Sequence, residues 1–194
     1  MIFNKLLKIL LKMSSVLTEI KELYLEYGSS DYIGENVTQT SHMIQTAMNA
    51  ELDGADRETI IAAFLHDIGH LIGLKEKLKG MDEWGVENHE KIGSNYLRNA
   101  NFPEKICKLV QNHVNAKRYL VTIYPEYYNE LSHASKKTLE YQGGRMTDQE
   151  LYEFDNDPLK KIYLQFRKWE DCSKVQFVKL DPIEKYFEMI NLLL

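Results

Sequence analysis

The stretch AAFLHDIGHLIG, Ala62–Gly73, sets two histidines and one aspartate among apolar residues and reads as a buried helix. His66 and His70 are four residues apart, which would place both rings on one face of that helix. A buried Asp67 carboxylate costs several kcal/mol unless a charge or a hydrogen bond compensates it. We therefore expect a cation beside Asp67 or a helix end at a polar site, and a metal ion meets this need directly.

The composition of the 194-residue chain indicates an all-α fold, a helical bundle in one domain. Four prolines and ten glycines interrupt it, and its long uninterrupted segments follow the helical period. Asp56 is expected to cap a helix, Pro103 to begin one, and Gly143 and Gly144 to end one. The longest loop is expected at 73–88, beside the site. Helices are expected at residues 16–26, 38–52, 57–66, 89–99, 104–113, 116–123, 132–141, 148–154, 158–170 and 182–193.

Charge and cysteine content argue against several classes of protein. The formal net charge is −5 and no run of Lys or Arg exceeds two residues, so a nucleic-acid partner is not expected. Two cysteines without a CxxC pair provide no disulfide framework and indicate a cytoplasmic location. The apolar part of residues 4–12, NKLLKILLK, is too short for a transmembrane segment. Residues 1–14 therefore read as an amphipathic extension, a packing or membrane-surface helix, before a domain at 15–194.

Five of the six histidines stand within or at the end of apolar helical patterns. A single buried histidine is more often a hydrogen-bonded core residue than a metal ligand. Here, however, an ordered set of histidines surrounds one His-Asp pair at helix-sized intervals, which core packing does not require. Helices that each contribute an inward histidine or carboxylate can build a metal site in the interior of a bundle. The residues concerned are His42, His66, His70, His89 and His113.

The order of these residues resembles that of the HD-domain superfamily of all-α metalloproteins, most of which are phosphohydrolases. A narrower resemblance covers nearly the whole chain after the N-terminal helix. It is to the PhnZ-type oxygenases, which cleave the carbon–phosphorus bond of hydroxyphosphonates. The matching blocks are DYIGENVTQTSH at 31–42, LHDIGH at 65–70, GVENHEKIG at 85–93, HVNAKRYL at 113–120, LSHASKKTLEYQGG at 131–144 and RKW at 167–169.

The resemblance implies two iron ions, Fe(II)/Fe(III), with dioxygen as co-substrate. The implied ligands are His42, His66, Asp67, His89 and His113, with Asp67 bridging the two ions. The family has an aspartate directly after the tryptophan and four residues before a lysine, whereas WEDCSK places Glu170 there. The sixth ligand is therefore Glu170 by register, or Asp171 if the helix is rotated.

Further roles follow from the same blocks. The resemblance implies that the phosphonate is bound by His70, Lys117, Ser135, Thr138 and Arg167, of which His70 and Lys117 also count as catalytic residues. Tyr32 and Glu35 are the remaining candidate catalytic residues, as a gate that leaves when substrate arrives. Taken singly, Lys117 and Arg167 read as surface charges and Ser135 as a helix N-cap. His133 has no implied role and is expected to be exposed.

The reaction implied is carbon–phosphorus cleavage of a small-molecule 1-hydroxyphosphonate in phosphonate catabolism. With 2-amino-1-hydroxyethylphosphonate the products would be phosphate and glycine. The head group and the oligomeric state stay open. One alternative is an HD-domain phosphohydrolase that acts on a nucleotide or another phosphoester with a metal-bound hydroxide. A second is a degenerate HD domain that serves as a binding module, which the complete ligand set disfavours.

Overall fold

The protein is an all-α bundle, as the composition predicts, in a computed structural model that describes residues 2–32 and 34–194. For residues 2–14 only the backbone is described. Within the described residues the extended segments are limited to two isolated bridges, Asp31 with Thr38 and Gly80 with Val86. The helices are α1 (Ile2–Tyr27), α2 (Gln39–Leu52), α3 (Arg57–Leu65), α4 (Ile68–Glu76), α5 (His89–Asn99), α6 (Glu104–Ile123), α7 (Pro125–Glu130), α8 (His133–Tyr141), α9 (Asp148–Asn156), α10 (Lys160–Asp171) and α11 (Ile183–Asn191).

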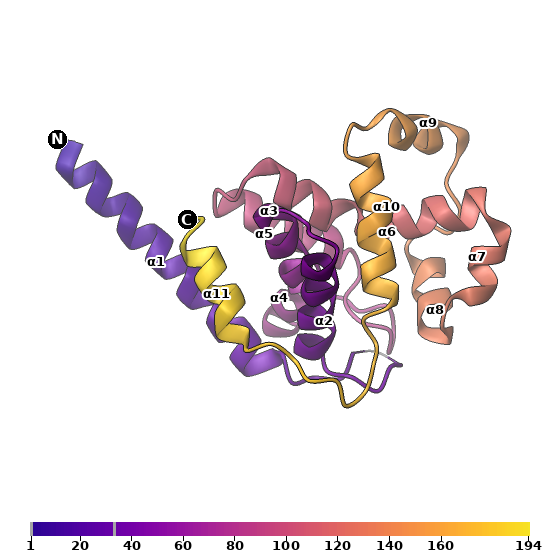
Figure 1. Ribbon diagram of the computed structural model, residues 1–194, viewed down its shortest axis with the longest axis horizontal. Helices are drawn as coiled ribbons and strands as arrows, with labels where there is room; N and C mark the ends of the chain where they lie inside the picture. The colour runs from indigo at the N-terminus through magenta and orange to yellow at the C-terminus, as the bar shows by residue number, and fades with distance from the viewer. Residues whose placement is uncertain (1, 33) are drawn as a thin grey trace.

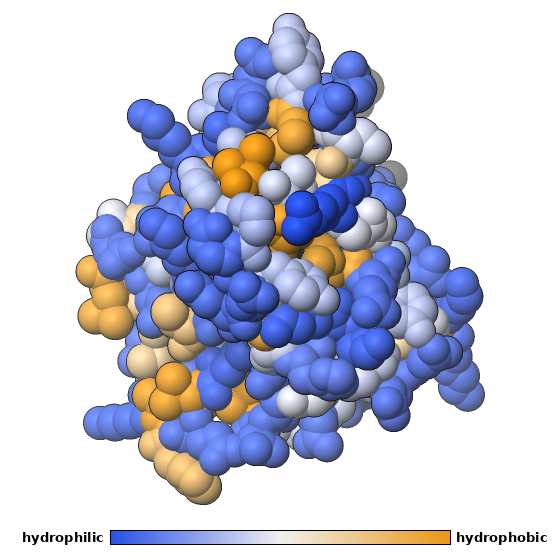
Figure 2. Space-filling model, turned by 90° about the vertical axis from the view of Figure 1, so that its right-hand side faces the viewer, coloured by the Kyte–Doolittle hydropathy of each residue, from blue (hydrophilic) through white to orange (hydrophobic). Residues whose placement is uncertain are grey.

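The centre of the bundle is α3, whose residues from Thr59 to Leu65 are all buried. A helix that is apolar on every side belongs in a protein interior. Helices α2 and α6 pack on α3, α5 packs on α4 and α6, and α10 closes the bundle against α2 and α6. Figure 1 shows α1 and α11 together on one side of this core and α7, α8 and α9 on the other. The face that carries α7 to α9 is mainly hydrophilic, with apolar residues in small separate patches (Figure 2).

The expectation that His66 and His70 share a helix is wrong. Helix α3 ends at Leu65 and α4 begins at Ile68, so His66 and Asp67 stand at the junction between them. A helix therefore ends at this polar pair of residues. A helix end at a polar site is one of the two outcomes expected for a buried Asp67. The loop expected from 73 also begins later, because α4 continues to Glu76.

The other helix boundaries differ in three ways. The segments expected at 104–113 and 116–123 form the single helix α6, and the short helix α7 was not expected. The helix expected from residue 16 is the C-terminal part of α1, which begins at Ile2. The side chains of the extension at 1–14 lie outside the described residues, so its amphipathic face stays a prediction. Among the residues described, no helix is long and apolar enough to cross a membrane.

Two local features fix the positions of the helices around the site. The Asp56 side chain accepts from the Thr59 amide at 3.1 Å and caps α3, as predicted. Gly69 lies against α5, where an added Cβ would stand 1.9 Å from the carbonyl oxygen of His89. Only glycine allows this approach of α4 to α5. The glycine of HDIGH therefore brings His89 close to Asp67.

Candidate active site

Asp67 lies at the centre of a buried cluster of histidines and is itself 2% exposed. Its Oδ2 is 3.2 Å from Nε2 of His66 and 3.7 Å from Nε2 of His42. Its Oδ1 is 3.4 Å from Nε2 of His89 and 3.5 Å from Nε2 of His113. Each carboxylate oxygen therefore faces a different pair of histidines. This is the arrangement that a carboxylate needs to bridge two metal ions.

Backbone carbonyls hold the four rings in one orientation. A carbonyl oxygen only accepts, so each Nδ1 carries the proton and each Nε2 presents its lone pair to the cluster. Burial lowers the pKa of His42, His89 and His113 to about 3, which keeps these rings neutral. The Nδ1 contacts are 2.8 Å from His42 to Ser173, 2.8 Å from His66 to Ala63, 3.3 Å from His89 to Val86 and 2.7 Å from His113 to Val110.

The inward nitrogen atoms come in close pairs. Nε2 of His42 is 3.1 Å from Nε2 of His66, and Nε2 of His89 is 3.1 Å from Nε2 of His113. Two lone pairs that face each other at this distance repel unless a cation lies beside both. Ligand atoms of His42, His66 and Asp67 also lie within 4.8 Å of one another. The donor set thus fits two metal ions, one on each side of Asp67.

Glu170, near the end of α10, presents a further unpaired oxygen. Glu170 is 4% exposed, and its Oε1 accepts a hydrogen bond from Nη1 of Arg167 at 2.5 Å. Its Oε2 is buried and has no hydrogen-bond partner among the described residues. Asp171 is less buried and is occupied by Arg167 and by the Tyr127 hydroxyl at 2.5 Å. Of the two candidate ligands, Glu170 therefore has a free buried oxygen and Asp171 does not.

His70 has the opposite orientation to the other histidines. Its Nδ1 accepts from the Val86 amide at 3.1 Å, so Nε2 carries the proton in the neutral ring. The ring stacks on His89 with the centroids 3.9 Å apart, and a ligand atom of His70 lies within 4.8 Å of those of Asp67 and His89. That proximity alone would allow metal ligation. The Val86 hydrogen bond instead makes His70 a hydrogen-bond donor to whatever occupies the cavity.

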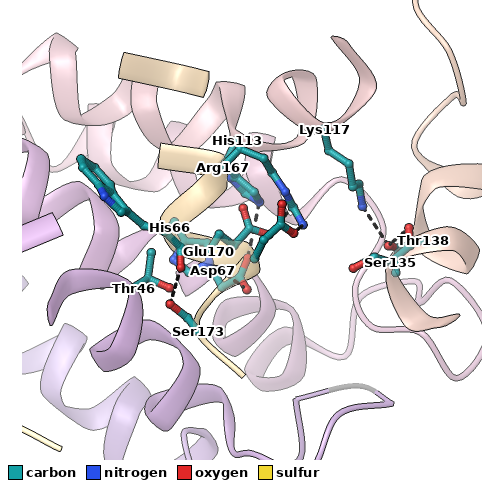
Figure 3. A network of polar contacts seen from close by, with 12 residues as sticks. Thr46, His66, Asp67, His113, Lys117, Ser135, Thr138, Arg167, Glu170 and Ser173 are labelled. Atoms are coloured by element: carbon teal, nitrogen blue, oxygen red, sulfur yellow. Dashed lines mark hydrogen bonds and ion pairs between the residues drawn. The ribbon is translucent and has the colours of Figure 1, made fainter. Parts of the chain in front are cut away.

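A cavity adjoins the cluster on the side of α6 and α8. Lys117, on α6, is 4% exposed, and its Nζ donates to Oγ1 of Thr138 at 3.0 Å. Burial, and secondarily Arg167, lowers the pKa of Lys117 to about 7. Figure 3 shows Lys117 pointing across from α6 toward Ser135 and Thr138, with the carboxylates of Asp67 and Glu170 lying together beside this group. The cavity is also lined by Tyr32, Glu35, His70, Trp84, His89, His113, Gln142, Arg167 and Lys174.

The segment before α2 covers one end of this cavity. The Tyr32 ring stacks on His42 at 3.8 Å, and burial and Asp67 raise the pKa of its hydroxyl well above the usual value. Glu35 accepts from Nζ of Lys174 at 2.9 Å. Both residues line the cavity.

Most of the predicted residues converge on this one place. All predicted substrate residues and both predicted gate residues line the cavity, and Lys117 and Arg167 are buried rather than surface charges. The N-cap of α8 is Ser132, so Ser135 is free of that role. His133 is exposed, as expected. The loop after α4 contributes Trp84 to the cavity, and its Val86 amide orients His70.

Lys174 lines the cavity, although the sequence patterns assign it no role in the site. It follows the C-terminus of α10, and its ammonium group donates to Glu35, Ser132 and Ser135. The available signal was its spacing, four residues after Glu170, where the family pattern has a lysine after the last ligand. A pattern of residues beyond a helix end does not show where the side chain points.

Comparisons with known proteins agree with this geometry. The model of the HD domain matches residues 36–160, which include the His66–Asp67 pair and the four histidines around it. The chain belongs to the HD-domain family. The chain is 37% identical over 87% of its length to the hydroxymethylphosphonate dioxygenase of Gimesia maris, of which it covers 83%. The family membership therefore extends to the phosphonate dioxygenases.

Two further relatives are similar to this chain over most of their length. One is the [1-hydroxy-2-(trimethylamino)ethyl]phosphonate dioxygenase (glycine-betaine-forming) of Leisingera caerulea, 40% identical over 76% of this chain and 74% of the relative. The other is an uncharacterized protein of Acanthamoeba polyphaga mimivirus, 46% identical over 86% of this chain and 76% of the relative. The HD-domain match ends at 160, so the wall formed by Arg167 and Glu170 lies outside it.

Proposed function

We propose that this enzyme is an iron-dependent oxygenase that uses dioxygen to cleave the carbon–phosphorus bond of a 1-hydroxyphosphonate. One substrate molecule and one dioxygen give one phosphate and one carboxylic acid, which balances all atoms. The observation that carries the proposal is the position of Asp67 between two histidine pairs, beside a cavity lined by buried cations and hydroxyl groups. The relatives named as phosphonate dioxygenases support the same class of reaction.

The metal ligands in this proposal are the four inward histidines, Asp67 as the bridge and Glu170 as the sixth ligand. Two iron ions, Fe(II)/Fe(III), held there would supply the binding and activation of dioxygen. The residues of the chain fix the geometry: the carbonyl contacts orient the rings, and Arg167 holds Oε1 of Glu170 while Oε2 is left without a hydrogen-bond partner among the described residues.

The phosphonate group fits the opposite wall of the cavity. Lys117 carries the cation, and Ser135 and Thr138 on α8 provide hydroxyl groups that adapt to phosphonate oxygens. His70 adds the Nε2 donor. Arg167 already donates to Glu170, Asp171 and Tyr127, which leaves two of its five N–H groups for the substrate. Binding on this wall holds the hydroxylated carbon near the metal ligands and restricts the access of water.

The test of the proposal is phosphate release from a panel of 1-hydroxyphosphonates by iron-loaded enzyme, with and without dioxygen. We expect release in air and none under anaerobic conditions. Release that persists without dioxygen would contradict the oxygenase proposal, because the carbon–phosphorus bond would then be cleaved without the oxidant. Failure of the iron-loaded enzyme to release phosphate from any member of the panel would also contradict the oxygenase proposal.

The choice of Glu170 as the sixth ligand predicts different results for two neighbouring carboxylates. Glu170→Gln should lower the iron content and abolish most activity, because an amide binds iron weakly and keeps no negative charge. Asp171→Asn should keep the iron content near that of the wild type, since this residue faces Arg167 and Tyr127. Metal analysis of the two purified variants checks the prediction, and the reverse pattern would make Asp171 the ligand.

Tyr32 and Glu35 are proposed as a gate rather than as part of the metal site. Tyr32→Phe and Glu35→Ala should change KM, or the fraction of dioxygen consumed without phosphate release, by more than they change iron content. The reason is that both residues line the cavity while Tyr32 contacts a proposed ligand only through ring stacking. Steady-state kinetics with metal analysis provides the check, and unchanged kinetics in both variants would remove the gate.

A further inference from the structure

The Lys174 ammonium group occupies a complete cation site at one end of the cavity. It lies 2.9 Å from Oε1 of Glu35, 3.1 Å from the Ser135 hydroxyl and 3.3 Å from the Ser132 hydroxyl. An ammonium group has three N–H donors, so all three are engaged. Its Nζ is also 6.0 Å from the centroid of the Tyr32 ring. A carboxylate, two hydroxyl groups and an aromatic ring are the groups that would receive an ammonium ion from a ligand.

This occupancy changes the charge that a substrate meets. Apart from Glu35, the acidic residues that line the cavity are Asp67 and Glu170, both of which the proposed function assigns to metal ions. Glu35 is therefore the carboxylate available to a cationic head group, and Lys174 already neutralises it. Both side chains are mostly buried, with 16% and 17% exposed, so solvent screens the pair weakly. A second ammonium group placed here would face the like charge of Lys174.

The aromatic lining and the space lead in the same direction. The Tyr32 ring already stacks on His42 and lies near Lys174, which leaves Trp84 as the other aromatic ring of the lining besides histidines. A single ring is a poor cage for a methylated ammonium group, which is held best among several rings. The cavity volume is about 40 Å³, whereas ligand pockets for larger molecules measure roughly 300–1,000 Å³. Each added head-group atom would require the walls to move.

We propose that the preferred substrate is a 1-hydroxyphosphonate with a small uncharged head group, of which hydroxymethylphosphonate is the simplest member. Lys174 acts as a specificity-determining residue that fills the place of a substrate cation. The inference rests on the proposed function and replaces the expectation of 2-amino-1-hydroxyethylphosphonate with a narrower one. With hydroxymethylphosphonate the carboxylic acid released beside phosphate is formate, and one dioxygen again balances the reaction.

The first experiment compares three substrates on the wild-type iron enzyme in air. These are hydroxymethylphosphonate, 2-amino-1-hydroxyethylphosphonate and its trimethylammonium analogue. We expect kcat/KM for the uncharged substrate to exceed that for each cationic substrate by about tenfold or more, the effect of ~1.4 kcal/mol. A preference for a cationic substrate would overturn this inference and leave the oxygenase proposal intact. No turnover of any of them would contradict the oxygenase proposal itself.

The second experiment uses Lys174→Met, with Lys174→Arg as the matched variant that keeps the charge. Removal of the charge exposes Glu35, so the ratio of kcat/KM for cationic to uncharged substrate should rise about tenfold in the methionine variant and stay low in the arginine variant. Iron content and melting temperature show whether the variants are folded. An equal loss of kcat/KM for all three substrates in Lys174→Met would contradict the inference, because it would show that Lys174 binds the common phosphonate group.

Discussion

Asp67→Asn is expected to remove iron from the enzyme and to lower phosphate release about a thousandfold, equivalent to ~4 kcal/mol in the barrier. The two oxygen atoms of Asp67 face two different histidine pairs, at 3.2 Å from His66 and 3.4 Å from His89. An amide offers one oxygen and no negative charge, so it cannot serve both ions at once. The loss should therefore appear in metal content as well as in turnover.

The matched control for Asp67→Asn is Asp53→Asn. Asp53 is an exposed carboxylate at the end of α2 that accepts from the Trp169 indole at 2.7 Å and does not line the cavity. The Asp53→Asn variant should keep both its iron and its activity. Elemental analysis measures the iron content of Asp67→Asn, and circular dichroism shows whether the variant is folded. A folded variant with the iron content of the wild type would contradict the bridging role.

Arg167→Met is expected to lower the free energy of unfolding by about 3–5 kcal/mol, the cost of leaving a buried charge without its partner. The Arg167 side chain is 2% exposed, and it neutralises Glu170 and Asp171 at the same time. Its Nε also donates to the Tyr127 hydroxyl at 3.0 Å. Removing the guanidinium group strands two carboxylates and leaves a gap in the wall of the cavity. Urea denaturation of metal-free protein measures this effect without a contribution from bound ions.

The comparison for Arg167 is Arg98→Met, which removes another arginine–carboxylate pair. Arg98 and Glu104 are 38% and 56% exposed, so their pair is screened by solvent and should contribute at most about 1 kcal/mol. If both variants lower the free energy of unfolding by the same small amount, Arg167 does not have the buried structural role assigned to it.

The fold class and most of the site follow from short-range patterns in the sequence. Helical periodicity gave the bundle, and the blocks around His42, His89 and His113 indicated which faces point inward. The chemistry of Asp67 was also predictable, because a carboxylate among apolar residues requires compensation. These features depend on the residue types and their spacing along one segment, which the sequence displays directly.

The remaining features depend on contacts between distant segments. The sequence around Asp67 is compatible with one continuous helix. The structure breaks it between α3 and α4, where Gly69 lies against α5. Helix α6 has no stop signal between residues 113 and 116 and continues through them, where the sequence predicts two helices. Lys174 reaches Glu35, a partner 139 residues away, and no local pattern defines such a pair.

The most direct measurement of the central claim is the ratio of dioxygen consumed to phosphate released by the iron-loaded enzyme acting on hydroxymethylphosphonate. An oxygen electrode and a phosphate assay on the same sample provide both quantities. The two-sided position of Asp67 and the adjoining phosphonate cavity predict one dioxygen for each phosphate, with Asp53→Asn giving the same ratio. Phosphate release without any consumption of dioxygen would contradict the claim.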